Sequence, residues 1–117
     1  MNIIRRNAFT LIELIIVLAI ISVILAVAVP NYLRSREESH KNGCIVNLRQ
    51  INSAIDQWAV ENGVATGTVP SEAEDEEIYG YIKGSRPSCP GGGSYTIHEV
   101  GGIEQVTCSM ADKGHRI

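Results

Sequence analysis

The chain has 117 residues, with ten lysines and arginines against 13 aspartates and glutamates, which gives a net charge of −3 at pH 7. This length allows one small domain at most, and the acidic balance argues against nucleic acid as a direct partner. The three histidines (His40, His98 and His115) are far apart in the sequence and fit no nucleophile or metal motif. We therefore expect no enzyme, no catalytic residue, no cofactor and no metal site.

An apolar segment begins after the first eight residues. Residues 9–29 form a run of 21 that is apolar except for two hydroxyl residues and one glutamate. As an α-helix this run would span roughly 32 Å, against about 30 Å of bilayer hydrocarbon. The charges that precede it are two arginines, and acidic residues follow it, so the positive-inside rule predicts a cytoplasmic N-terminus. The sequence predicts a single pass through the cytoplasmic membrane, with residues 31–117 exported.

Three interpretations of this N-terminus compete. A secretory signal peptide would be cut at a small-residue site such as Ala26-Val27-Ala28. A passive anchor would not be cut at all. A prepilin leader would lose residues 1–8 alone and keep the apolar helix. The first two describe a small secreted or membrane-anchored extracytoplasmic protein, and this remains the alternative.

Glu13 favours the third interpretation. A charged residue at the centre of a membrane helix costs about 2.5 to 3.5 kcal/mol, although less near the interface. A signal peptide or a passive anchor gains nothing from that cost, so the carboxylate indicates a specific partner. Cleavage after Ala8 would create such a partner, the new amine of Phe9, most favourably on a neighbouring subunit.

The segment "FTLIELIIVLAIISVILAVAVPNY" resembles the N-terminal signature of type IV pilins and type II secretion pseudopilins. The resemblance implies that a prepilin peptidase cuts after Ala8 and methylates the amine of Phe9. It also implies that Glu13, with Thr10 beside it, guides assembly into a helical filament, and that Pro30 bends the helix. One departure stands out, because the family usually has glycine where this chain has Ala8.

The next segment, residues 30–62, continues the helix with a different pattern. Apolar residues recur at alternating spacings of four and three, which predicts a helix with one buried face; these are Cys44, Leu48, Ile51, Ile55 and Trp58. Gly43 and Pro30 are the weak points of this helix. Asn62-Gly63 is a typical C-terminal stop. We therefore predict one helix over residues 9–62, with a membrane half and an amphipathic half.

Residues 63–117 are predicted to form a small globular head of loops and short elements. Ser71 followed by Glu74 is a capping-box pattern that predicts one short helical turn. The acidic residues around it indicate a solvated face. Alternating residues in 95–100, the pair Gly101-Gly102 and the returning segment 103–108 predict a β-hairpin. A sheet this small needs the amphipathic helix as its second layer.

The three cysteines suggest a covalent link in the head. Cys89 precedes the first predicted strand and Cys108 ends the second, so a disulfide between them would close a loop of about 20 residues and contribute on the order of 3 kcal/mol. Three cysteines allow three single pairings, and the choice of this pair rests on expected proximity. Cys44 is then left as a buried thiol or as a site of intermolecular bonding.

These observations predict an α+β, pilin-like fold, in which a long N-terminal helix packs on a small antiparallel head. The resemblance implies a structural subunit that is cleaved, methylated and polymerised. Its implied partners are other copies or minor pilins, the prepilin peptidase, a platform protein, an assembly ATPase and membrane lipid. The small acidic head, without a display loop, slightly favours a type II secretion pseudopilus over a type IV pilus.

Overall fold

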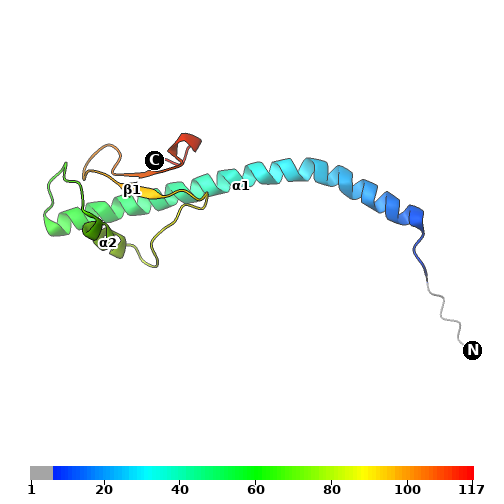
Figure 1. Ribbon diagram of the computed structural model, residues 1–117, viewed down its shortest axis with the longest axis horizontal. Helices are drawn as coiled ribbons and strands as arrows, with labels where there is room; N and C mark the ends of the chain where they lie inside the picture. Colours follow the sequence, from blue (N-terminus) through cyan, green and yellow to red (C-terminus); the bar gives the residue numbers. More distant parts are fainter. Residues whose placement is uncertain (1–6) are drawn as a thin grey trace, which may run out of the picture. The chain divides into compact units, whose positions relative to one another are not determined.

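A computed structural model describes residues 7–117 (Figure 1). Helix α1 (Leu11–Asn62) is followed by helix α2 (Glu72–Gly80), strands β1 (Tyr95–Ile97) and β2 (Val106–Cys108), and the 3₁₀ turn η1 (Ala111–Lys113). The long N-terminal helix and the small antiparallel sheet confirm the α+β, pilin-like fold. The chain forms two compact units, Met1–Arg36 and Glu37–Ile117.

In the first unit the start of α1 is set by a capping box. The backbone N–H of Thr10 donates to Glu13 Oε2 at 2.9 Å, and the backbone N–H of Glu13 donates to Thr10 Oγ1 at 3.4 Å. These two bonds satisfy donors that a helix N-terminus leaves without intrahelical partners. Every described side chain from residue 7 to residue 36 is exposed. The described residues of this unit therefore provide no packing partner for this apolar stretch of α1.

In the second unit α1 buries the predicted face. The five stripe residues are all buried, and two alanines beside them are buried as well, Ala54 and Ala59. The helix ends as predicted at Asn62, where Gly63 takes a positive φ of 63° and the N–H of Val64 donates to Ala59 O at 2.9 Å. This arrangement is a Schellman motif, which glycine permits because it has no Cβ.

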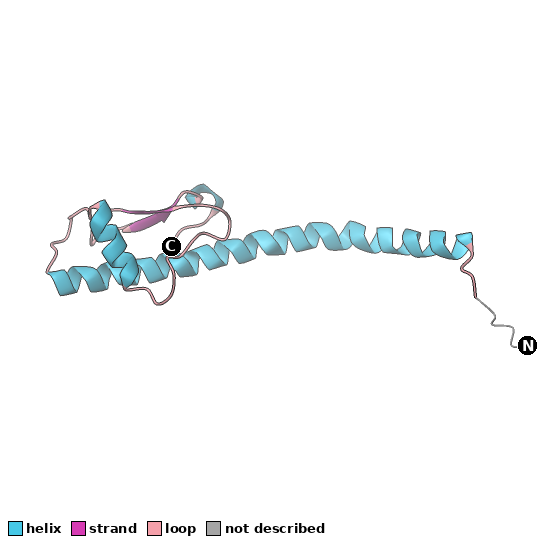
Figure 2. Ribbon diagram, turned by 60° about the horizontal axis from the view of Figure 1, so that its bottom comes forward, coloured by secondary structure: helices cyan, strands magenta, loops and turns pink. Residues whose placement is uncertain are grey.

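Helix α2 lies beside α1 in this unit (Figure 2). The predicted capping box is present, because the N–H of Ser71 donates to Glu74 Oε2 at 2.7 Å. The helix runs for nine residues, which is longer than the single turn that the sequence predicted. It continues because Ile78 packs into the core, and because Glu77 accepts a hydrogen bond from Trp58 Nε1 at 3.2 Å.

The predicted hairpin is correct in its pairing and wrong in its turn. Tyr95 pairs with Cys108 and Ile97 pairs with Val106, and one further bond, from the N–H of His98 to Gln105 O at 2.7 Å, ends the ladder before Gly101-Gly102. The intervening loop binds elsewhere: the N–H of Val100 donates to Thr68 O, and the N–H of Gly67 donates to Val100 O. Gly67 and Thr68, in the segment between α1 and α2, thus bind the backbone of Val100, which a tight hairpin would have paired with the opposite strand.

One core holds the second unit together. It combines the buried face of α1 with residues of α2, the two strands and their loops, namely Ile78, Tyr79, Cys89, Ile97, Val100, Val106 and Cys108. The small sheet therefore uses α1 as its second layer, as predicted. All three cysteines lie in this core.

Candidate functional site

Two regions carry the residues that the sequence singled out. The first is the N-terminal segment, where Phe9 and Thr10 directly precede α1, Glu13 lies in its first turn, and all three are exposed. The carboxylate of Glu13 is held against the backbone of Thr10, one peptide away from the predicted new terminus at Phe9. A negative charge at this place stabilises the N-terminal end of its own helix.

The cleavage site lies at the edge of the described chain. Residues 1–6 of the predicted leader lie outside the described residues, while Ala8 and Phe9 are exposed and precede the helix. Such an extended, accessible segment is open to a peptidase. Pro30 lies inside α1, where it leaves a backbone carbonyl of the preceding turn without a helical donor. Cleavage, methylation and bending at these residues remain predictions.

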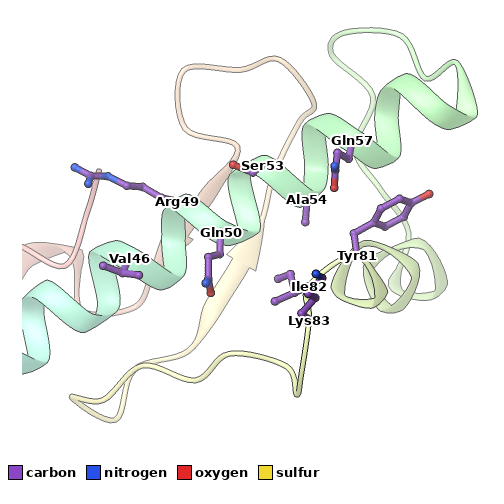
Figure 3. A pocket seen from close by; sticks show the side chains of 9 residues that line it. All are labelled: Val46, Arg49, Gln50, Ser53, Ala54, Gln57, Tyr81, Ile82 and Lys83. Carbon is purple, nitrogen blue, oxygen red and sulfur yellow. The ribbon is translucent and has the colours of Figure 1, made fainter.

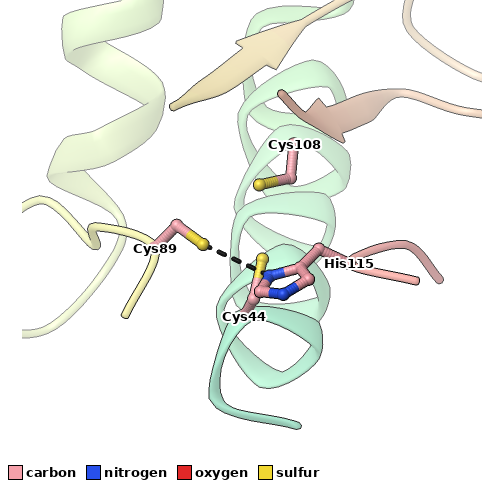
Figure 4. Close-up of side chains that lie close together, drawn as sticks. All are labelled: Cys44, Cys89, Cys108 and His115. Carbon is pink, nitrogen blue, oxygen red and sulfur yellow. Dashed lines mark hydrogen bonds between the residues drawn. The ribbon is translucent and has the colours of Figure 1, made fainter. Parts of the chain in front are cut away.

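The second region is a cluster of three thiols and an imidazole, the side chains of Cys44, Cys89, Cys108 and His115 (Figure 4). Their sulfur and ring nitrogen atoms all lie within 4.8 Å of one another. All four residues are buried, with exposed fractions between 0% and 6%. Cys89 Sγ lies 3.4 Å from His115 Nδ1. The four side chains come from four segments: α1, the loop before β1, the end of β2 and the tail after η1.

Glycines allow these segments to meet. A Cβ on Gly93 would lie 2.8 Å from Cys108 Sγ, and one on Gly91 would lie 2.9 Å from His115 Cε1. Gly43, which the sequence marked as a weak point of the helix, has a packing role, since a Cβ there would approach Pro90 Cγ to 3.0 Å. The sequence "CPGGG" therefore lies close to both the helix and the cluster because it has little side-chain volume.

The surroundings of two of the thiols shift their pKa values in opposite directions. Burial raises the pKa of Cys44 to about 12, although a hydrogen bond from Tyr95 opposes the shift. Burial also acts on Cys89, but the backbone N–H groups of Gly93 and Gly91, with the neighbouring thiols, outweigh it and lower the pKa of this cysteine. Cys89 is therefore the sulfur of this pair that ionises more easily.

The predicted disulfide between Cys89 and Cys108 is not confirmed. All three cysteines are free in the described chain, and Cys44 lies beside the other two instead of standing alone. The sequence assigns His115 to no motif, yet this residue completes the cluster. A usable signal was present in the sequence, because three cysteines and a histidine were the full set of ligands that a four-coordinate metal needs.

The acidic residues of α2 have separate contacts. Glu74 caps the helix, Glu76 pairs with Arg86 at 3.0 Å, and Glu77 accepts from Trp58. Carboxylates that point to different partners do not converge on one cation. The arrangement agrees with the solvated face that the sequence predicted.

An open groove runs along α1 beside residues 81–83 (Figure 3). Its described lining is mixed and contains no cysteine, histidine or carboxylate: Val46, Arg49, Gln50, Ser53, Ala54, Gln57, Tyr81, Ile82 and Lys83. The groove is thus distinct in position and chemistry from the thiol–imidazole cluster.

Comparison with known proteins connects the first region to a family. Residues 4–29 match the model of the prokaryotic N-terminal methylation motif. The chain is 30% identical over 93 residues to the ComG operon protein 3 homolog of Bacillus licheniformis, an alignment that covers 80% of this chain and 91% of the relative. It is 27% identical over 109 residues to type II secretion system core protein G of Escherichia coli, covering 83% and 74%. No solved structure matches the chain.

Proposed function

This chain belongs to the family of type IV pilins and type II secretion pseudopilins and is a structural subunit of secretion or pilus-like filaments; from that premise we propose how it matures and assembles. A prepilin peptidase cleaves between Ala8 and Phe9 and methylates the new amine. The retained helix then leaves the membrane for the filament. The membrane-spanning potential of α1, by length and composition, supports inner-membrane anchoring before that step.

The observation that carries the proposal is the exposed apolar stretch of α1 with Glu13 at its start. Its described side chains have no partner within their unit, so lipid or sister helices must cover them. On assembly the helix exchanges lipid contacts for packing against other copies, and minor pilins join by the same contacts. The carboxylate of Glu13, paired with the Phe9 amine of a neighbour, sets the register between subunits. Thr10 keeps that carboxylate in place.

The remaining parts of the machine are supplied by other proteins. A platform protein and an assembly ATPase in the inner membrane drive polymerisation, with the N-terminus in the cytoplasm and the head exported. Its family consists of structural subunits, and we propose no catalytic role for this chain. We also propose no direct contact with nucleic acid, because removal of the leader takes two arginines away from an already acidic chain.

We favour a type II secretion pseudopilus as the destination. Similarity to several core G proteins of such systems and the small acidic head support this choice. A pilus of the ComG kind is the second candidate, because the ComG operon protein 3 homolog is matched over 91% of its length. Isolation of long surface fibres that contain this chain would favour the second candidate.

The test separates the charge of Glu13 from its role in capping. Glu13→Gln removes the charge but keeps a side chain that can accept the Thr10 N–H, whereas Glu13→Ala removes both. We expect Glu13→Gln to be inserted and cleaved normally, with filament yield at least about tenfold lower, the change that about 1.4 kcal/mol produces. Yield is measured by shearing and sedimentation, and cleavage by N-terminal sequencing.

Thr10→Ser is the matched control, because serine also caps a helix and carries no charge. It should assemble at the level of the native chain. Normal filament yield from Glu13→Gln would contradict the proposed pairing with Phe9.

A further inference from the structure

We propose that Cys44, Cys89, Cys108 and His115 bind one structural zinc ion. Three cysteines and one histidine are an established donor set for structural zinc, which is four-coordinate and tetrahedral. The four side chains are buried and converge from four segments of the unit Glu37–Ile117 (Figure 4). The ion would link α1 to the loop, the strand and the tail that pack on it. This role is separate from the filament contacts of the N-terminal helix.

The spacing of the ligand atoms fits the size of the ion. With zinc–sulfur distances of about 2.3 Å, two sulfur ligands of a tetrahedral site lie roughly 3.8 Å apart. The four atoms here all lie within 4.8 Å of one another, and Cys89 Sγ lies 3.4 Å from His115 Nδ1. A tetrahedral ion would draw these atoms closer together around one centre.

The backbone around the cluster is suited to ionised sulfur. Residues 91 and 93 approach two different ligands so closely that a Cβ at either position would collide with a ligand atom. The N–H groups of the same two glycines point toward Cys89 Sγ. Donors of this kind stabilise a metal-bound thiolate, and they reach it here because the glycines admit a close approach.

An outer ring of hydrogen bonds holds a second ligand. The hydroxyl of Tyr95 donates to Cys44 Sγ at 3.5 Å, and it accepts from Asn47 Nδ2 at 3.1 Å. Asn47 also donates to Ser88 O at 3.0 Å, next to Cys89 in the chain. Side chains in this position orient metal ligands and tune their basicity. The helix and the ligand loop are thus connected by hydrogen bonds beside the cluster.

Zinc accounts for the cluster better than the other candidates. Any single disulfide uses two sulfurs and leaves the third thiol and the imidazole buried beside it. Calcium and magnesium prefer oxygen ligands, which this cluster does not offer. Zinc uses all four side chains, binds without redox change and matches the mixture of sulfur and nitrogen.

The experiment uses the full-length chain, purified in detergent from membranes of cells grown with zinc, in buffers free of chelator. The zinc and iron content per chain is measured by elemental mass spectrometry. Free thiols are counted by alkylation under denaturing conditions after zinc removal, without reductant. We expect one zinc per chain and three alkylated cysteines. A chain without zinc that holds a disulfide between any two cysteines, or a chain with iron in place of zinc, would overturn the proposal.

Ligand variants localise the metal. Cys108→Ser and His115→Gln should lose the stoichiometric zinc. His98→Gln is the matched control, since His98 is exposed and bonds to Thr107 Oγ1 at 2.8 Å outside the cluster, and it should keep one zinc per chain. Retention of zinc by both ligand variants, or its loss from the control, would refute the assignment.

If a ligand variant fails to fold, a spectroscopic measurement on the native chain still tests the zinc proposal. Zinc is replaced by cobalt(II), whose absorption reports geometry and sulfur ligation. We expect intense visible bands of a tetrahedral ion and a sulfur-to-cobalt charge-transfer band in the near ultraviolet. A spectrum of weak, octahedral bands would overturn the proposal.

Discussion

At the scale of single residues, Asp75 is held at a cost to stability. Its Oδ1 atom is buried and has no hydrogen-bond partner in the described chain. Burial raises its pKa above the ordinary value of 3.8, Arg86 opposes the shift, and neighbouring glutamates add to it. The folded chain therefore binds the proton of the Asp75 carboxyl group more tightly than the unfolded chain does. The free energy of unfolding falls as the pH rises from 3.8 through the higher pKa of the folded state.

We predict that Asp75→Asn raises the thermal midpoint at pH 7, because the amide removes an ionised group that the fold disfavours. The gain should disappear below about pH 3.8, where the aspartate is protonated in both states. Circular dichroism melting in detergent at pH 3 and pH 7 measures the effect. Asp112→Asn, at an exposed residue, should change the midpoint little at either pH. An equal gain from Asp75→Asn at both pH values would contradict this account.

The thiol–imidazole cluster shows why single residues were harder to predict than elements. The stripe of α1 correctly placed Cys44 in the core, because helical periodicity fixes which face is buried. Nothing local indicates that His115 turns back to the same place. Its position depends on Gly114, which has a φ of 85°, and on the space that Gly91 leaves for the ring. Contacts of this kind depend on the folded loops and not on any periodic pattern.

At the scale of elements, long-range side-chain bonds decided the shape of the loop between β1 and β2. The helix was predicted almost to the residue because its pattern is long and its stop is a local motif. The predicted tight turn of the hairpin was wrong because the side-chain amide of Gln105 binds to α1, outside the hairpin. Its amide donates to Asn52 Oδ1 at 3.2 Å and Asp56 Oδ1 at 2.9 Å, and its Oε1 accepts from the N–H of Gly101 at 2.8 Å. Neither partner on α1 can be identified from the hairpin sequence.

We predict that Gln105→Ala lowers the free energy of unfolding by about 1 to 3 kcal/mol, because it removes three part-buried hydrogen bonds that link the loop to α1 and to Gly101. Gln57→Ala is the control, because Gln57 is exposed and lies on α1 beside the partners of Gln105. It should change stability by less than about 0.5 kcal/mol. Urea unfolding followed by circular dichroism gives both values. Equal effects of the two substitutions would show that the hydrogen bonds from Gln105 to α1 contribute nothing to stability.

At the scale of the whole molecule, the two compact units differ in how they satisfy their apolar residues. The unit Glu37–Ile117 buries a core of its own, whereas the described side chains of residues 7–36 are all exposed. A sequence pattern reveals this division well, since a long apolar run differs in composition from an amphipathic helix. The described residues of its own unit do not cover the exposed run.

We predict that maturation depends on a small residue at position 8. Ala8→Leu should reduce cleavage at least about tenfold, because added side-chain volume is rejected by a pocket shaped for a small group. Ala8→Gly should be cleaved as well as the native chain or better. The mass of the chain extracted from membranes distinguishes the uncleaved and cleaved forms. A native chain that still begins at Met1 in cells with an active prepilin peptidase would contradict the proposed maturation.

The bond between Trp58 and Glu77 has a practical consequence. Trp58 is the only tryptophan of the chain, it is buried in the core, and its indole N–H donates to a side chain of α2 at 3.2 Å. Indole fluorescence responds to both hydration and hydrogen bonding, so its emission wavelength reports whether α2 is docked. The subunit thus carries its own optical probe, which can follow the head in a bilayer and in a polymer without any attached dye.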